Sequence, residues 1–192
     1  MGISMATLRR MRREFDATLG GLIDWESFSV DQVRVAVASR VGGEIIICAR
    51  HWEERGYFGL TLGCTTQQGR RWLVLYEQDA DAEHQLVIVL HELMHVALGH
   101  CSADQSSGEV RRELARIGMV PDPSARIVYA RVCMPGAHRE ADPRGEERAA
   151  EFAATLIVTR AKRAGTLPPA GKTIGTEQLA ISSFLGWDAE TN

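Results

Sequence analysis

Residues 86–99 read LVIVLHELMHVALG, an almost wholly apolar passage that ends at a glycine. Asp79 and Asp81 precede it as candidate N-caps, and Gly99 supplies a helix stop. An apolar helix of this length belongs in the interior of a globular domain, because crossing a bilayer takes about 20 consecutive apolar residues. The passage therefore predicts a buried helix against which the rest of the chain packs.

The segments around this helix predict a mixture of helices and strands. Apolar residues recur at helical spacing, with glycine or capping residues near the ends, in three further segments: 8–20, 30–41 and 146–162. The second of these begins with a capping box formed by Ser29 and Gln32. Runs of β-branched or alternating apolar residues predict three strands, at 44–49, 57–63 and 72–76. Together these elements indicate an α+β fold.

The chain has 192 residues, which suits one compact domain and leaves little room for a second core. We expect this domain to span residues 1–164, with an insertion at about 102–145 that prolines and glycines interrupt. Within the insertion, the spacing of Val110, Leu114 and Ile117 suggests a short helix. Residues 165–192 are expected to form a C-terminal tail that docks on the domain or frays.

Charge and cysteine content narrow the class of protein. The formal net charge is −3, so no global positive field attracts nucleic acid or an anionic membrane. Four arginines between residues 9 and 13 are expected to form a solvated helix face, and no apolar segment follows them to complete a secretory signal. The four cysteines include no Cys-x-x-Cys pair, which argues against a zinc knuckle or a disulfide-rich scaffold. We therefore expect a cytoplasmic protein that contacts neither nucleic acid nor membrane directly.

The buried helix carries His91-Glu92-Leu93-Met94-His95, an H-E-x-x-H sequence. Histidines four residues apart lie one helical turn apart on one face, so both imidazoles can bind one tetrahedral Zn²⁺. Glu92 directly follows the first histidine, beside the open coordination position, and is the candidate general base. Ordinary core histidines are the alternative, but two imidazoles and a carboxylate are costly to bury on an apolar helix without a metal or partners. The motif therefore predicts a catalytic zinc site.

A catalytic zinc takes three protein ligands, so one more must come from outside the motif. His100 and Cys101 are nearest in sequence, but the metzincin pattern needs histidine where this chain has Cys101 and glycine where it has Leu98. His100 is expected instead to interact with free carbonyls at the helix C-terminus. Glu109 and Glu113 fall outside the centre of an apolar stripe and are expected on the surface.

The alanine-rich helix that begins at residue 146 offers better candidates, because small side chains let it approach the histidine-bearing helix closely. Glu147 and Glu151 lie one turn apart at the edge of its apolar arc, so one can bind zinc while the other orients a histidine. Glu146 stacks above the apolar positions, and periodicity slightly favours it. The residues alone therefore leave Glu146 and Glu147 both open as the third ligand.

The sequence His91-Glu92-x-x-His95-x-x-Leu98-Gly99-His100, followed by the alanine-rich segment 146–157, resembles the ImmA/IrrE family of zinc metallopeptidases. The resemblance covers roughly residues 44–160. In that family the third ligand opens a Glu-x-x-Ala-(Asn/Asp/Glu) motif, which Glu147 matches in full, whereas Glu146 leaves an alanine at the final position. The resemblance thus implies that Glu147 is the third zinc ligand. It also implies a zincin-like, gluzincin-type fold with a small, mostly antiparallel sheet on helices.

The resemblance further implies a function, because members of the family resemble regulatory proteases that cleave a helix-turn-helix repressor. The expectation is a zinc endopeptidase with Zn²⁺ as cofactor and a transcriptional repressor as partner. Two alternatives stay open, a zinc-stabilised binding module that holds its partner uncut and a zinc hydrolase of small amides. Tyr57, Tyr129, His138 and several arginines are available to stabilise an oxyanion, but no spacing selects one of them. The long interval between His95 and Glu147 leads us to expect that the insertion lies over the cleft.

Overall fold

The computed structural model describes residues 5–52, 58–66, 69–100, 112, 115, 126–133 and 145–167, with the backbone alone at residues 66 and 126–133. The longer helices within these ranges are α1 (Met5–Phe15), α2 (Val30–Val41), α3 (Ala82–Ala97) and α5 (Glu146–Ala164). A π-helical turn (Asp16–Gly20) continues α1, and a 3-10 helix (Trp25–Ser27) precedes α2. The strands in the same ranges are β1 (Gly43–Arg50), β2 (Gly59–Thr66), β3 (Gly69–Glu77) and β4 (Arg126–Cys133).

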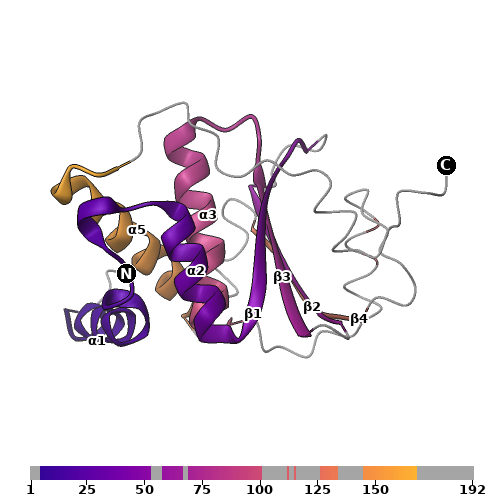
Figure 1. The fold of residues 1–192 in the computed structure, drawn as a ribbon, viewed down its shortest axis with the longest axis horizontal. Coiled ribbons are helices and arrows are strands. Elements are labelled where there is room, and N and C mark those ends of the chain that lie inside the picture. Colours follow the sequence, from indigo (N-terminus) through magenta and orange to yellow (C-terminus); the bar gives the residue numbers. More distant parts are fainter. Residues whose placement is uncertain are drawn as a thin grey trace.

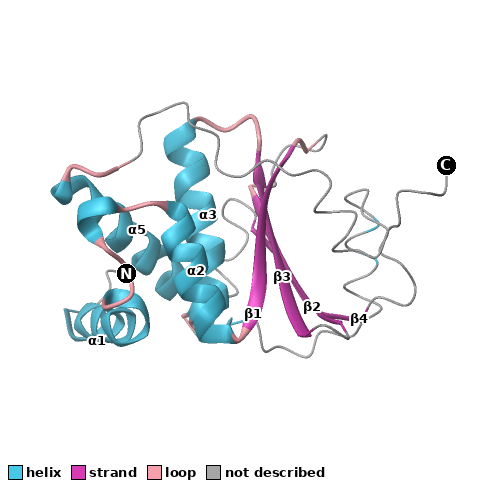
Figure 2. Cartoon of the chain, in the orientation of Figure 1, coloured by secondary structure: helices cyan, strands magenta, loops and turns pink. Residues whose placement is uncertain are grey.

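The strands form one mixed sheet in the order β1-β3-β2-β4. β1 runs parallel to β3, whereas β2 pairs antiparallel with both β3 and β4. The four helices lie on one side of this sheet (Figure 1), and α2 and α3 contact it directly. Helices and strands therefore form two separate layers (Figure 2), which confirms the predicted α+β class. The expected antiparallel arrangement holds for two of the three strand pairs, and the parallel β1–β3 pair is the exception.

The ends of the helices follow from the capping residues that the sequence shows. The Ser29 hydroxyl accepts a hydrogen bond from the Gln32 backbone N–H at 3.2 Å, so Ser29 is the N-cap of α2. The second half of the predicted capping box is not formed, because the Gln32 side-chain amide donates to Ser27 instead. Gly42 ends this helix in the left-handed conformation, with φ of 64°, which costs glycine little. The Asp81 carboxylate accepts from the His84 backbone N–H at 2.9 Å and caps α3. The predicted helices and strands outside residues 102–145 are confirmed, with ends shifted by a few residues.

The segment expected as an insertion contains a strand that the sequence analysis missed. β4 adds to the edge of β2 within residues 102–145, with a register shift between Gly63 and Cys64. Its sequence, RIVYARVC, has the β-branched and aromatic content of a strand, but flanking prolines drew the interpretation toward a broken loop. The short helix expected around Val110 and the tail beyond residue 167 lie outside the described residues.

The core lies between the helices and the sheet. Along β3, Trp72, Val74 and Tyr76 alternate and join the apolar cluster that the helices complete. The residues between them, Leu73 and Leu75, are fully buried on the opposite face of the sheet. α3 is the central helix, since most of its residues from Gln85 onward are buried. No helix in the described part of the chain is both long and apolar enough to cross a membrane.

Arg160 joins the N-terminal segment to α5. Its guanidinium donates to the Asp16 carboxylate at 2.6 Å and lies 5.2 Å from the ring centroid of Phe15 and 5.3 Å from that of Trp25. Because the side chain is largely covered, we expect Arg160→Ala to lower the free energy of unfolding by about 1–2 kcal/mol. Urea unfolding followed by circular dichroism measures this loss. Arg163→Ala, on the exposed side of the same helix, is the control, and an equal loss there contradicts the prediction.

Candidate metal centre

α3 brings two imidazoles together at the surface that it shares with α5. His91 and His95 lie one turn apart, and their Nε2 atoms are 3.0 Å from each other. The His95 side chain is 1% exposed and that of His91 14% exposed. The two rings meet nearly edge to face, with centroids 4.7 Å apart. Both Nε2 atoms therefore converge on one point, as the helical spacing of the motif predicts.

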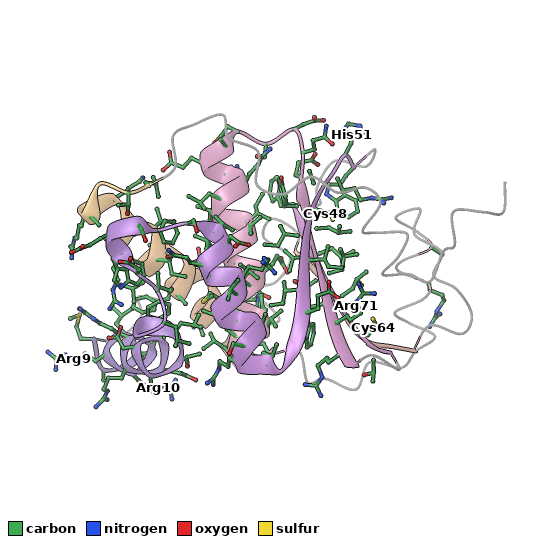
Figure 3. The ribbon with its side chains drawn as sticks, in the orientation of Figure 1. Arg9, Arg10, Cys48, His51, Cys64 and Arg71 are labelled. Atoms are coloured by element: carbon green, nitrogen blue, oxygen red, sulfur yellow. The ribbon has the colours of Figure 1, made fainter. Side chains whose placement is uncertain are left out.

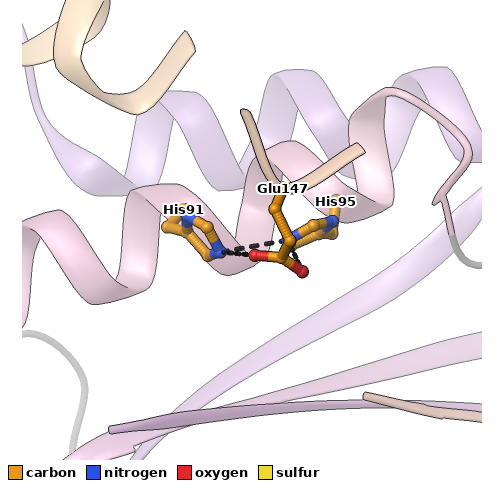
Figure 4. A group of neighbouring side chains, drawn as sticks. All are labelled: His91, His95 and Glu147. Carbon is orange, nitrogen blue, oxygen red and sulfur yellow. Dashed lines mark hydrogen bonds and ion pairs between the residues drawn. The ribbon is translucent and has the colours of Figure 1, made fainter. Parts of the chain in front are cut away.

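α5 supplies a carboxylate to the same point. Glu147 lies in the first turn of this helix, which begins after Gly145. Its two carboxylate oxygens lie 3.3 Å from His91 Nε2 and 3.4 Å from His95 Nε2 (Figure 4). The buried face of α5 contains mostly alanine, and α3 and α5 contact each other extensively. The small side chains permit the close approach that the sequence analysis expected.

The spacing of these three groups fits a tetrahedral metal ion. Zinc binds imidazole nitrogen and carboxylate oxygen at about 2.0–2.2 Å, so two ligand atoms at the tetrahedral angle lie roughly 3.3–3.5 Å apart. The two carboxylate-to-imidazole distances match this value, and the distance between the two imidazoles is slightly shorter. Each ligand atom of His91, His95 and Glu147 lies within 4.8 Å of the others. Two neutral imidazoles and one carboxylate are also a donor set that zinc accepts.

The geometry distinguishes between the glutamates that the sequence left open. Glu147 shares the cluster with both histidines, and Glu146 is not part of it. Glu151, considered as a residue that orients a histidine, is exposed one turn further along the helix. The structure thus brings together the three residues named from the sequence as metal ligands.

His100 makes a contact that the sequence analysis did not predict. It was expected to interact with carbonyls at the end of α3, yet its Nδ1 lies 3.1 Å from Nδ1 of His95. This is the ring nitrogen of His95 on the side away from His91 and Glu147, whose contacts are with Nε2. Metal-binding histidines usually use their second nitrogen for a hydrogen bond that fixes ring orientation. His100 occupies that position relative to His95.

Glu92 lies between α3 and the sheet. Its side chain is fully buried, and Oε2 accepts a hydrogen bond from the Thr61 hydroxyl on β2 at 2.5 Å. Thr61 is also fully buried. This threonine is not predictable from local sequence, because nothing there indicates which strand faces the helix. The sequence offers one signal for Thr61: it is a small polar residue between two glycines, in a strand that packs against the H-E-x-x-H helix.

Several other candidates are now placed or lie outside the described residues. Glu109, Glu113, Cys101, Tyr57 and His138 are outside, and Tyr129 is described by its backbone alone. Burial raises the pKa of the Cys64 thiol, which makes this cysteine a poor nucleophile and metal ligand. His84 is exposed beside Phe58, and it does not join the metal cluster. Arg9 and Arg10 extend from α1 into solvent (Figure 3), in agreement with the solvated face that was expected.

A second cluster of possible metal ligands contains His51, Glu77 and Asp79. His51 follows β1 and Asp79 follows β3, and these parallel strands end at the same edge of the sheet (Figure 3). The sequence analysis did not find it, because recognising it requires knowledge of the parallel pairing. His51 Nδ1 and Asp79 Oδ2 are 2.6 Å apart, and both side chains are more than 60% exposed. A hydrogen bond between two exposed side chains accounts for this contact without a metal.

Comparison of the chain with protein-family models, with curated proteins and with solved structures found no match.

Proposed function

We propose that this protein is a cytoplasmic, zinc-dependent peptidase with a zincin-like fold. His91, His95 and Glu147 would hold the zinc ion, and Glu92 would act as general base. The proposed substrate is a peptide bond in a protein partner, and the sequence resemblance favours a helix-turn-helix repressor. The placement of the motif supports the proposal, because the buried helix α3 carries both histidines and Glu92.

One observation carries the proposal: three ligand atoms from two helices converge at tetrahedral spacing. The two histidines come from α3 and the carboxylate comes from α5, so this spacing depends on tertiary packing. Glu92 adds a proton acceptor on the same helix, one residue from a ligand.

The residues of the chain divide the chemistry between them. Zinc, when bound, supplies Lewis-acid chemistry, which polarises a carbonyl group and makes water nucleophilic near neutral pH. The Glu92 carboxylate accepts a proton from the attacking water as the water oxygen bonds to the peptide carbonyl carbon. Glu92 then gives this proton to the amide nitrogen as the carbon–nitrogen bond breaks. The second proton of the water passes from the new carboxyl group to the freed amine, so a carboxylate and an ammonium group leave. One carboxyl group thus acts first as base and then as acid.

Cleavage of a mixed peptide library tests the proposal even while the protein partner is unidentified. Zinc-loaded protein is incubated with the library, and mass spectrometry identifies new termini. We expect cleavage at a restricted set of sequences, which stops when a chelator removes zinc and resumes when zinc is restored. Zinc binding without cleavage of any peptide favours the binding-module alternative, and cleavage of simple amides alone favours the small-amide hydrolase.

His100 is expected to strengthen zinc binding through its contact with His95. Removal of a partner that orients a metal ligand typically lowers metal affinity 10- to 100-fold, so we expect about this loss for His100→Ala. Competition with a chromophoric chelator measures the dissociation constant. His84→Ala, which removes an exposed histidine from the helix that carries His95, is the control and should leave affinity unchanged. Equal affinity of His100→Ala and the wild type contradicts this role.

A further inference from the structure

We propose that Thr61 is a positioning residue, which fixes the Glu92 carboxylate from the neighbouring strand for its work as general base. The inference rests on the proposed peptidase function and adds the part that the sheet plays in it. Thr61 lies on β2, whereas the H-E-x-x-H motif lies on α3. It does not belong to the ligand cluster.

The hydrogen bond between the two side chains is short and shielded from water. Thr61 Oγ1 donates to Glu92 Oε2 at 2.5 Å, within the range of charge-assisted O–H···O⁻ bonds. Both residues have no exposed surface. In such surroundings a hydrogen bond to a carboxylate is stronger than in water, and an apolar replacement leaves a buried acceptor without its donor. The contact is therefore a strong local constraint on Glu92.

Gly59 provides the space that the carboxylate occupies. A Cβ atom on Gly59 would lie 2.8 Å from Glu92 Oε1 and 3.1 Å from Glu92 Cγ. It would also meet the Ile88 side chain, on the preceding turn of α3, at 3.0 Å. The two oxygens of Glu92 thus have different neighbours on β2, the Thr61 hydroxyl at Oε2 and the Gly59 backbone at Oε1.

Alternation along β2 explains why these two residues act together. Gly59, Thr61 and Gly63 are two residues apart, so they share one face of the strand, and the contacts of Gly59 and Thr61 show that this face meets α3. A Cβ on Gly63 would lie 2.5 Å from the Trp72 ring, which fills the space there. The face of β2 that packs against α3 therefore has one hydroxyl between two positions without side chains.

A positioned carboxylate matters because proton transfer depends steeply on geometry. A free glutamate side chain rotates about three bonds, and displacement of a catalytic group by about 1 Å can cost roughly 100-fold in rate. The Thr61 bond fixes one oxygen and limits rotation of the carboxylate. Because Thr61 is fully buried and acts through Glu92, its loss should lower kcat and leave KM largely unchanged.

The test uses paired variants of the zinc-loaded, full-length protein on a peptide identified in the library experiment. Thr61→Val keeps the shape of the side chain and removes the hydroxyl, and we expect kcat to fall about 30- to 100-fold with KM within about 3-fold. Thr61→Ser restores a hydroxyl and should recover kcat to within about 5-fold of the wild type. Thr65→Val, at an exposed position of the same strand, is the matched control and should leave kcat unchanged.

Two measurements do not depend on turnover. Zinc dissociation constants of Thr61→Val and the wild type should agree within about 3-fold, because the Thr61 hydroxyl donates to Glu92, which is not one of the three residues of the ligand cluster. Proton NMR should show a slowly exchanging, downfield hydroxyl signal in the wild type that disappears in Thr61→Val and moves in Glu92→Gln. Should Thr61→Val fail to fold, Gly59→Ala keeps the hydroxyl, displaces the carboxylate and should lower kcat in the same way.

The outcomes separate this inference from the proposed function. If the wild type cleaves and Thr61→Val or Gly59→Ala matches its kcat, the positioning role is overturned and the peptidase proposal stands. If Thr61→Ser is as slow as Thr61→Val, the hydroxyl is not what matters and the inference is likewise overturned. If the wild type cleaves no peptide although the hydroxyl signal is present, the proposed function is wrong. The contact between Thr61 and Glu92 then has no catalytic role.

Discussion

A Glu92→Gln variant is expected to bind one zinc ion per chain, to keep its fold and to hydrolyse peptides at least about 1,000-fold more slowly than the wild type. Glutamine has the shape of glutamate, and its amide oxygen can accept the same hydrogen bond from Thr61. It cannot accept a proton from water near neutral pH. General acid–base catalysis contributes about 10²- to 10⁴-fold, and here one carboxylate would serve both proton transfers.

The measurement combines kcat on a library-derived peptide, elemental mass spectrometry for zinc and thermal unfolding. Glu83→Gln is the control: Glu83 lies on the same helix, but its side chain is 62% exposed in an ion pair with Lys162, which contributes little to stability. Activity of Glu92→Gln within 10-fold of the wild type would remove Glu92 from the mechanism. A variant that cuts nothing and still controls its partner in the cell would support the binding module.

Replacing Glu147 by alanine is expected to weaken zinc binding more than about 100-fold. This loss of affinity is larger than the loss expected when a residue that only orients a metal ligand is removed. The reason is the contact of its carboxylate oxygens with Nε2 of both His91 and His95. Glu146→Ala removes a neighbouring carboxylate from the same helical turn and should change zinc affinity by less than about 3-fold. The two variants lose the same charge, so a general electrostatic effect would weaken both equally.

Zinc stoichiometry by elemental mass spectrometry and chelator competition give the answer, on protein purified without a histidine tag. Weakening by Glu146→Ala instead of Glu147→Ala would assign the third ligand to the other glutamate. A wild type that retains no zinc after zinc is supplied and the excess removed would refute the metallopeptidase proposal itself.

The local parts of the site could be predicted from the sequence. His91 and His95 share a helix, and a four-residue interval fixes their relation once the helix is known. The capping residues Ser29, Asp81 and Gly42 acted as their local chemistry predicts. Glu147 was harder, because helical periodicity gives a direction around the helix axis and does not say which turn meets the partner helix. The resemblance named the residue, and the contacts of its carboxylate agree with that choice.

Features that depend on tertiary packing could not be predicted. Thr61 acts on Glu92 because β2 lies opposite α3, and the sequence does not reveal that β2 is inserted between β3 and β4. The contact between His100 and His95 requires the chain to turn back after Gly99, whose φ is 74°. β4 was missed for a different reason, since its β-branched and aromatic residues are visible in the sequence but the surrounding prolines favoured a loop.

Glu147 comes well after both histidines in the sequence, because β4 and its flanking residues lie between them. This order determines when the metal site is completed during synthesis. A chain still on the ribosome exposes α3, with both imidazoles and Glu92, well before α5 has been synthesised. Translation adds about 5–20 residues per second, so several seconds pass with two of the three ligands present. We therefore expect a nascent chain to hold zinc weakly and to cut nothing, which stalled-ribosome complexes of defined length can verify. The protein would reach its active form only as its last described helix docks.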